Sequence, residues 1–214
     1  MPGTRSPIVH FRPAAAGDAA AAVPLIYSSG PAAFDYVFAV PGRASAQDFL
    51  QRAFVDGAGE FGWRNHCVGV LDGAVVAVGA GYGGEGGFAF TLAAARQILA
   101  HYGPRHAPGV IARGLGVERV IPPPARGMHY LAHLGVAPEL RGQGIGRALV
   151  EHLLARGRAL GRRRMVLDVA ASNPRAQALY ERLGFTVTEE RRSRLANGHG
   201  AVPDHRRMER VVAG

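Results

Sequence analysis

Residues 134–149 read LGVAPELRGQGIGRAL, which joins the end of an apolar stretch to a glycine-rich turn and then to a helical pattern. Ile145, Leu149 and Leu153 recur at every fourth position, as on the buried face of an amphipathic helix. The glycines of the turn let the chain fold tightly, so that several backbone N–H groups converge at the positive end of the helix. The stretch therefore predicts a binding site for pyrophosphate.

Two familiar phosphate motifs do not fit this turn. The dinucleotide fingerprint G-x-G-x-x-G fails because its third glycine falls on Arg147 or on Leu149. The lysine of a P-loop has no counterpart, because the chain contains no lysine. A glycine-rich turn that binds nothing stays open as the alternative.

The residues around the turn alternate between strand and helix patterns. We expect strands over 130–136, 165–170 and 185–189, and helices over 145–160 and 174–183. A strand, a tight turn, a helix and a second strand form a βαβ unit, whose two strands lie parallel. The unit predicts a parallel pair of strands at the centre of the fold.

The N-terminal half predicts a strand, helices and a hairpin. The strand covers 8–12, the helices cover about 20–26, 33–38 and 45–54, and the hairpin strands cover 67–71 and 74–81 around Asp72-Gly73. Residues 82–127 are the least regular, with one helix near 92–102, and we interpret them as an insertion between strands. A last strand is expected over 205–211, after a turn at Asn197-Gly198.

Length and composition predict one globular domain over residues 1–214. The chain has 22.5 kDa, 48% hydrophobic residues and a mean hydropathy of +0.03, so it can bury a core. Its one cysteine, Cys67, excludes an internal disulfide framework. The start MPGTRSPIVHFR has no apolar leader pattern, and no run of about 18 apolar residues occurs. We therefore expect a soluble cytoplasmic protein without a membrane partner, and a homodimer is left open.

The charge balance favours an anionic partner. Arginine supplies all 25 basic residues against 16 acidic ones, a formal net charge of +9. Without lysine, protein kinase and Schiff-base chemistry are excluded. The arginines favour a phosphorylated cofactor or a nucleic acid, or they reflect genomic composition alone. Nucleic acid is not expected, because no aromatic residues interleave with Arg162–Arg164, Arg191–Arg192, Arg194 or Arg206–Arg207. The nine histidines show no metal-ligand spacing, so no metal is expected.

The turn stands between two further motifs. LGVAP at 134–138 precedes it, and NPRAQALYERLGF at 173–185 follows it. Together they resemble the GCN5-related N-acetyltransferase (GNAT) family over residues 128–186. The resemblance implies an α/β fold with a mixed, mostly antiparallel sheet flanked by helices, a central parallel βαβ unit and a helical insertion before the fourth strand. It also implies that 128–186 form an acetyl-CoA-binding core and 82–127 an insertion.

The resemblance implies a position for the acetyl-CoA co-substrate. Pyrophosphate is expected on Arg141, Gly142, Gln143, Gly144, Ile145, Gly146 and Arg147. For Arg147, a plain surface arginine is the alternative. The backbone of Leu134, Gly135 and Val136 is expected to pair with the pantetheine arm as an added strand would.

Two residues of the second motif are expected to serve the same ligand. Asn173 stands before Pro174, so it caps the helix or contacts pantetheine. Tyr180 lies about two turns further on. Its phenol is expected to give a proton to the departing CoA thiolate, and a packed aromatic ring is the alternative.

The implied reaction is direct attack of an amine on the thioester, in a ternary complex. The attacking ammonium must first lose a proton. Asp168 is the first candidate base, unless it pairs with one of Arg162–Arg164, and His133 is the second. His129 and His133 are four residues apart and are expected on one strand face. The resemblance places an oxyanion donor at the N–H of Val136.

The acceptor is expected to be an amine on a small molecule or a peptide N-terminus. The resemblance places its pocket near the N-terminal helices and the last strands. Aromatic and polar candidates there are Tyr27, Ser28, Ser29, Phe34, Asp35 and Tyr36, with an ordinary helix break as the alternative. The competing function is an acyl-CoA-binding sensor or regulatory module of the same fold without transfer activity.

Overall fold

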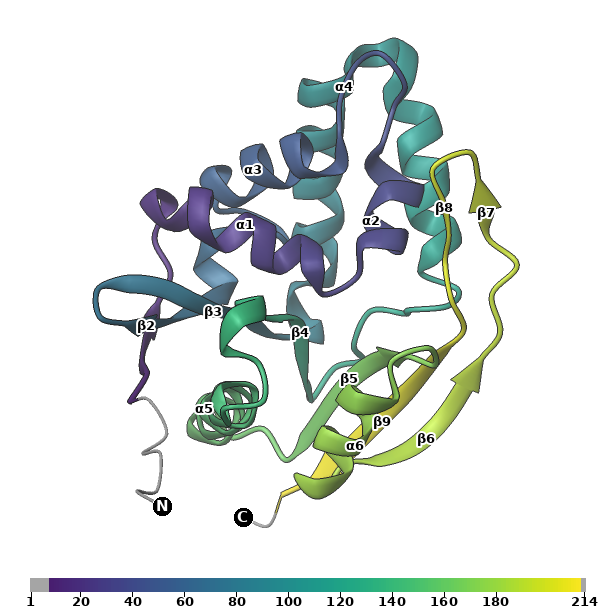
Figure 1. Cartoon of the computed structure of the whole chain (residues 1–214). Coiled ribbons are helices and arrows are strands. Elements are labelled where there is room, and N and C mark those ends of the chain that lie inside the picture. Colours follow the sequence, from purple (N-terminus) through teal and green to yellow (C-terminus); the bar gives the residue numbers. More distant parts are fainter. Residues whose placement is uncertain (1–7, 213–214) are drawn as a thin grey trace.

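A computed structural model describes residues 8–212 of the protein. Residues 1–7, which open the stretch without a leader pattern, lie outside the described part. Seven strands form one sheet in the order β1-β2-β3-β4-β5-β9-β6 (Figure 1). All neighbours are antiparallel except β4 and β5, which are parallel. The expected mixed sheet with a central parallel pair is thereby confirmed.

The elements follow the predicted order. The strands are β1 (His10–Pro13), β2 (His66–Leu71), β3 (Ala74–Gly83), β4 (Met128–Val136), β5 (Arg164–Ala170), β6 (Thr186–Arg191) and β9 (His205–Val211), with β7 (Ala196–Asn197) and β8 (Gly200–Ala201) in a separate hairpin. The helices are α1 (Ala19–Ser28), α2 (Pro31–Phe38), α3 (Ala46–Asp56), α4 (Gly87–Val117), α5 (Ile145–Ala159) and α6 (Pro174–Arg182).

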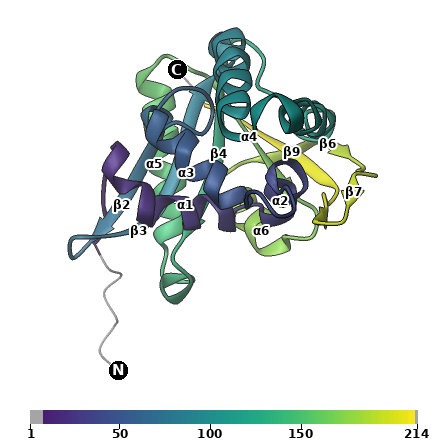
Figure 2. The ribbon, with the colours of Figure 1, turned by 90° about the horizontal axis from the view of Figure 1, so that it is seen from above.

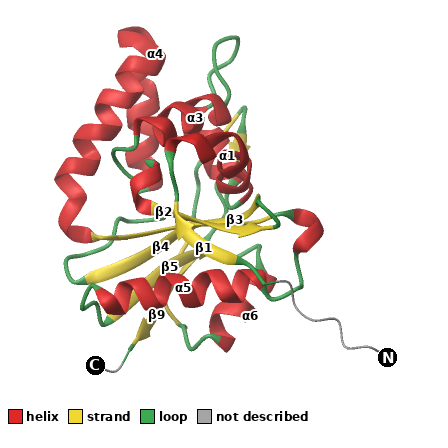
Figure 3. Cartoon of the chain, turned by 90° about the vertical axis from the view of Figure 1, so that its left-hand side faces the viewer, coloured by secondary structure: helices red, strands yellow, loops and turns green. Residues whose placement is uncertain are grey.

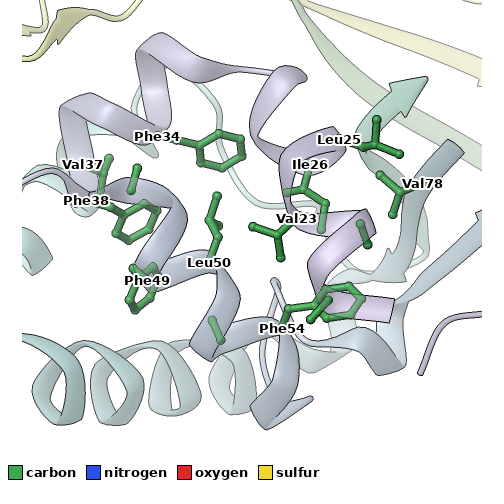
Figure 4. Close-up of a cluster of buried hydrophobic side chains, with 14 of the residues drawn as sticks. Val23, Leu25, Ile26, Phe34, Val37, Phe38, Phe49, Leu50, Phe54 and Val78 are labelled. Carbon is green, nitrogen blue, oxygen red and sulfur yellow. The ribbon is translucent and has the colours of Figure 1, made fainter. Parts of the chain in front are cut away.

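The sheet separates two layers of helices. α1, α3 and α4 lie on one side of it, and α5 and α6 lie on the other (Figure 3). The view from above shows α2 in the first layer beside α1 and α3 (Figure 2). Aromatic side chains fill this layer, where Phe38 of α2 stacks on Phe49 of α3 at 4.3 Å between ring centroids (Figure 4). Each such buried ring contributes about 1.5–3 kcal/mol to folding.

The second layer follows from the fourth-residue repeat of α5. Leu149 and Leu153 are buried against the sheet together with Met165 and Leu167 of β5. The glycine turn therefore opens a helix that is fixed along its whole apolar face. This fixes the direction in which the N-terminus of α5 points.

The insertion is more helical than its sequence suggests. α4 extends from Gly87 to Val117, with a kink where Gly103 adopts a positive φ of 70° before Pro104. Tyr102 is buried and donates to the Phe38 carbonyl at 2.6 Å, and Arg113 donates to the Val37 carbonyl at 2.7 Å. The insertion thus packs on α2 and belongs to the first layer.

The β7–β8 hairpin reaches α2 from the far end of the sheet. It forms around the turn expected at Asn197-Gly198. The side chain of Asn197 donates to the Tyr36 carbonyl at 2.9 Å. In Figure 1 the hairpin rises from β6 and β9 beside α2. Within residues 8–212, no helix combines the length and the apolar character that a bilayer span requires.

Candidate active site

The parallel strands β4 and β5 separate after three residue pairs. The pairs are Met128 with Arg164, His129 with Met165 and Tyr130 with Val166. Beyond Tyr130, β4 continues beside β3, and β5 continues beside β9. Residues 131–136 therefore have no strand on the edge that faces β5, among the residues that the structure describes. The sheet opens here, at the carboxyl ends of two parallel strands.

The free edge of β4 presents the backbone of Val136. The N–H of Ala137 donates to the Val76 carbonyl at 2.9 Å, toward β3. Neighbouring residues of a strand point their backbone groups to opposite sides, so the N–H and C=O of Val136 point into the opening. Its carbonyl accepts from Arg141 Nε at 3.1 Å. The N–H of Val136 therefore faces the opening between β4 and β5.

Gly135 brings α1 against this edge. A Cβ atom at Gly135 would collide with the carbonyl of Leu25. Leu134 points to the opposite face of the sheet, toward α5. Its side chain meets those of Leu149 and Leu153 beside Gly79, where a Cβ atom would be within contact distance of all three. β4 is therefore clamped between the two helical layers.

The glycine turn has a backbone that other residues rarely adopt. Gly142 and Gly144 have φ values of 81° and 84°, and a Cβ at either would meet no atom within 4 Å. Glycine is therefore favoured at both positions by the backbone conformation and not by lack of space, and the space beside them is open. Gly144 caps α5, whose first N–H groups have no carbonyl partners within the helix. Gln143, Gly144, Ile145 and Arg147 line a hollow of about 260 Å³ beside the helix end.

The two arginines of the turn, Arg141 and Arg147, make different contacts. Arg141 bonds to β4, as described above, and thereby ties the turn to the open edge. Arg147 points along α5, where its Nε donates to Glu151 at 2.9 Å in an exposed ion pair. Surface pairs of this kind contribute little, so Arg147 is easily released.

α6 carries Asn173 and Tyr180 on the α5 side of the sheet. The Oδ1 of Asn173 accepts from the Ala176 N–H at 3.1 Å, which is the expected helix cap. Tyr180 is buried and its ring lies 6.2 Å from that of Phe185. Burial raises the pKa of Tyr180 to about 12, so its phenol is protonated at neutral pH.

Asp168 is fully engaged by neighbouring donors. Its carboxylate accepts from Tyr130 at 2.7 Å and from Arg207 at 2.7 and 3.2 Å, and Arg191 lies 3.6 Å away. Its side chain is 2% exposed. The expected pairing with Arg162–Arg164 is wrong: Arg162 pairs with Glu85 and Arg164 with Glu209. The cause is register, because β9 places Arg207 directly opposite Asp168.

A bulge in β4 turns His133 to the other face of the sheet. The pairing with β3 shifts between Ala80–Ala132 and Val78–Gly135, and His133 adopts a positive φ of 55°. The expectation that His129 and His133 share a face is therefore wrong, because the extra residue reverses the alternation. His129 packs near Gly157 of α5, whereas His133 contacts Phe34 of α2 at 6.0 Å between ring centroids.

His133 belongs to a polar cluster on the α2 side of the sheet. Its Nδ1 lies 3.1 Å from His66 Nε2, and its Nε2 lies 3.6 Å from Glu60 Oε1. Glu60 also accepts from the Tyr82 hydroxyl at 2.9 Å. Tyr82 and Tyr130 are direct neighbours on β3 and β4, with 5.6 Å between ring centroids. The cluster thus adjoins the Asp168 contacts.

The cluster keeps Glu60 charged. Burial acts to raise the pKa of Glu60, but the nearby His133 and the hydrogen bond from Tyr82 outweigh it, so this pKa lies below its ordinary value. The side chain of Glu60 is 44% exposed and that of His133 is 7% exposed. Glu60 therefore connects a buried histidine with solvent.

Sequence reasoning missed Glu60, His66 and Tyr82. Glu60 lies in an irregular turn before β2, and His66 lies 67 positions from His133, so no local pattern joins them. For Tyr82 the alternation of side chains along a strand was a usable signal. Tyr82 stands two residues beyond Ala80 on β3, so the two side chains lie on the same face of the sheet.

The expected acceptor residues are only partly available. The hydroxyls of Ser28 and Ser29 donate to the carbonyls of Leu25 and Ile26, at 2.8 and 2.7 Å, and so close the end of α1. Asp35 accepts from Tyr27 at 2.7 Å, a bond that raises the pKa of Tyr27 to about 12. Of the six candidates, Phe34 is the one whose ring lies beside His133.

The remaining candidate is Tyr36, whose carbonyl accepts from Asn197 of the β7–β8 hairpin. This contact joins the β7–β8 hairpin to α2. Among residues 8–212, no three or more His, Cys, Asp or Glu side chains are grouped to hold a metal ion.

The model of the acetyltransferase (GNAT) family matches residues 44–185, well over half of the chain. The chain therefore belongs to the GNAT family.

Known relatives match over shorter segments. A 5-NmdU N-acetyltransferase of Pseudomonas phage PaMx11 is 47% identical over 60 residues, which are 28% of this chain and 41% of that protein. The ribosomal protein bS18-alanine N-acetyltransferase of Escherichia coli K12 is 44% identical over 63 residues, or 29% of this chain and 43% of that one. The matched segments thus span less than half the length of these relatives.

Solved structures match over nearly the whole chain. The structure of yncA from Salmonella typhimurium, which was solved with its cofactor acetyl-CoA, has a TM-score of 0.57. It covers 97% of this chain and 95% of that one at 18% identity. This likeness confirms the fold.

Proposed function

We propose that the protein is an acetyl-CoA-dependent N-acetyltransferase that moves an acetyl group to an amine by direct attack in a ternary complex. The observation that carries this proposal is the open edge of β4 beside the N-terminus of α5. Beyond Tyr130 this edge has no strand partner among the described residues, so its backbone can pair with a pantetheine arm, as a strand edge does. Family membership and the acetyl-CoA complex of a solved relative support the same ligand.

The turn would hold the pyrophosphate of acetyl-CoA. The N–H groups of Gly142–Arg147 meet at the positive end of α5, where the space beside Gly142 and Gly144 is open. Arg141 and Arg147 supply permanent positive charge. Leu134, Gly135 and Val136 pair with pantetheine, and the N–H of Val136 stabilises the thioester oxygen as it gains charge. Asn173 caps α6 through Oδ1, which leaves its amide N–H groups for the same arm.

Tyr180 supplies the proton for the departing thiolate. Its raised pKa supports this role, since the phenol stays protonated until the thiolate forms. Of the two bases suggested by the sequence, the contacts favour His133. Asp168 already accepts from Tyr130 and Arg207, so we assign it to holding β4, β5 and β9 together.

The acceptor is most consistent with a small amine. Glu60 offers a negative, half-exposed side chain to an ammonium group beside His133.

Transfer is tested by thiol release from acetyl-CoA with a panel of primary amines, from ethanolamine to spermidine, and with short peptides. The proposal expects release with at least one amine and an N-acetyl product by mass spectrometry. Acetyl-CoA binding without any product would instead support the non-catalytic sensor.

A further inference from the structure

We propose that His66 fixes the protonation state of His133 so that His133 Nε2 accepts the amine proton, and that Glu60 stabilises the imidazolium so formed. This inference rests on the proposed function. His133 is then a catalytic residue, and His66 is a positioning residue that acts through it. The three side chains come from β4, β2 and the turn before β2.

The tautomers follow from one backbone carbonyl. His66 Nδ1 lies 2.9 Å from the carbonyl oxygen of Gly62, and a carbonyl can only accept. His66 therefore carries its proton on Nδ1 and presents a lone pair at Nε2. His133 Nδ1, 3.1 Å from that lone pair, must be the donor. In neutral His133, the unprotonated nitrogen is consequently Nε2, which is the atom beside Glu60.

His66 cannot take the proton itself. Burial, assisted by the charge of His133, lowers the pKa of His66 to about 3. Its ring is 1% exposed and lies parallel to that of His133, at 5.3 Å and 10° between planes. Phe54 closes its other side at 5.4 Å. A neutral and immobile His66 thus holds one tautomer of its neighbour.

Glu60 provides the opposite charge. Its Oε1 lies 3.6 Å from His133 Nε2, and the Tyr82 hydroxyl orients it. The other neighbours of His133 are the apolar rings of Phe34 and Phe61, at 6.0 and 5.1 Å. Within residues 8–212, Glu60 and His66 are the titratable side chains in polar contact with His133. Glu118 lies nearby: burial, and then the charge of Glu60, raise the pKa of Glu118.

The proton balance closes without another reactant. The ammonium gives one proton to His133 Nε2, from which it leaves to solvent along the exposed side of Glu60. The nitrogen lone pair forms the C–N bond while the C–S electron pair leaves with sulfur. Tyr180 gives its proton to sulfur, and the second proton of the former ammonium restores the Tyr180 phenol.

The first test reads the tautomers by nuclear magnetic resonance of the full chain labelled with ¹⁵N in histidine. His133→Asn assigns the signals of His133. We expect neutral His133 to carry its proton on Nδ1 in wild type and in Glu60→Gln, because His66 and not Glu60 fixes the tautomer. A proton on Nε2 of neutral His133 in either protein would overturn the inference.

The second test separates positioning from structure. His66→Leu removes the lone pair at Nε2, whereas His66→Gln keeps an acceptor toward His133 and a donor toward Gly62. The Nδ1 tautomer of His133 should be lost in the first variant and retained in the second. Loss in both variants, with folding intact by circular dichroism, would contradict the role of His66.

The third test measures kcat and KM with the amine from the panel that releases thiol fastest. Since Glu60 lies 3.6 Å from His133 Nε2 and stabilises the imidazolium, Glu60→Gln should lower kcat, and Glu118→Gln, a change at a nearby carboxylate without contact to His133, should lower it less. Equal kcat in wild type and Glu60→Gln would refute this role of Glu60 beside His133. If no amine releases thiol, the proposed function fails, while the tautomer measurements still decide the geometry.

Discussion

Asp168 and Arg207 face each other across β5 and β9, where the guanidinium donates to both carboxylate oxygens at 2.7 and 3.2 Å. Both side chains are nearly buried, at 2% and 9% exposure. Removing one partner of such a pair leaves the other charge uncompensated. Asp168 is therefore expected to matter first for stability.

Asp168→Asn should lower the free energy of unfolding by about 3 kcal/mol, as the loss of one partner of a buried pair does. Urea titration followed by circular dichroism measures this. Glu151→Gln, which breaks the exposed pair with Arg147, should change stability by less than about 1 kcal/mol. Equal effects would show that the Asp168 pair is not buried in solution.

Tyr180→Phe should reduce kcat by about 10²–10⁴-fold, because the thiolate loses its proton donor. Acetyl-CoA affinity and thermal stability should stay near the wild-type values, since the ring is kept. Steady-state thiol release and calorimetry report the two quantities. An unchanged kcat would leave Tyr180 as a packed aromatic ring.

Gly135→Ala should weaken folding by about 1–3 kcal/mol, because the methyl group collides with the Leu25 carbonyl and pushes α1 from β4. Gly109→Ala is the control, since its Cβ would meet only Arg113 at 3.8 Å. Thermal unfolding of both variants is the measurement. A stable Gly135→Ala protein would mean that α1 does not clamp the open edge.

Acid should destabilise the protein below pH 6.5. Burial lowers the pKa of His66 to about 3 and that of His129 to about 4, so the folded state favours their neutral forms. Their contribution is complete above the ordinary value of 6.5 and falls as the pH drops toward the folded values. Each histidine should cost about 1.4 kcal/mol per pH unit in that window.

His129→Gln should flatten this dependence, measured as urea midpoints between pH 7 and 4. His106→Gln is the matched control, because His106 lies on α4 away from both buried rings. If His129→Gln and wild type show the same slope, His129 is not held neutral in the folded protein.

The sequence predicts best where its signals are local. The turn at 141–146, the repeat of α5 and the cap at Asn173 depend on residues within a few positions, and their elements are confirmed within one or two residues. The parallel pair at the centre of the sheet followed from the βαβ unit, and the mixed, mostly antiparallel sheet followed from the family resemblance. The helix expected near 92–102 does not end the helical region, because a second helical segment follows the kink at Gly103 and continues to Val117.

The site was less predictable because it depends on register and on distant pairs. One extra residue in β4 moved His133 from the face of His129 to that of Phe34. The partner of Asp168 is fixed by β9, 39 positions away, and not by the arginines beside β5. Such contacts arise only when the sheet has formed.

Calorimetric titration with acetyl-CoA tests most directly whether the glycine turn binds this ligand. Gly144→Glu places bulk and negative charge where the pyrophosphate should lie. Gly161→Glu is the matched control, because Gly161 has a similar φ of 71°, is equally open and follows the opposite end of α5. We expect binding by wild type and Gly161→Glu, and loss in a folded Gly144→Glu protein. Absence of binding by wild type, or equal binding by both variants, would contradict this expectation.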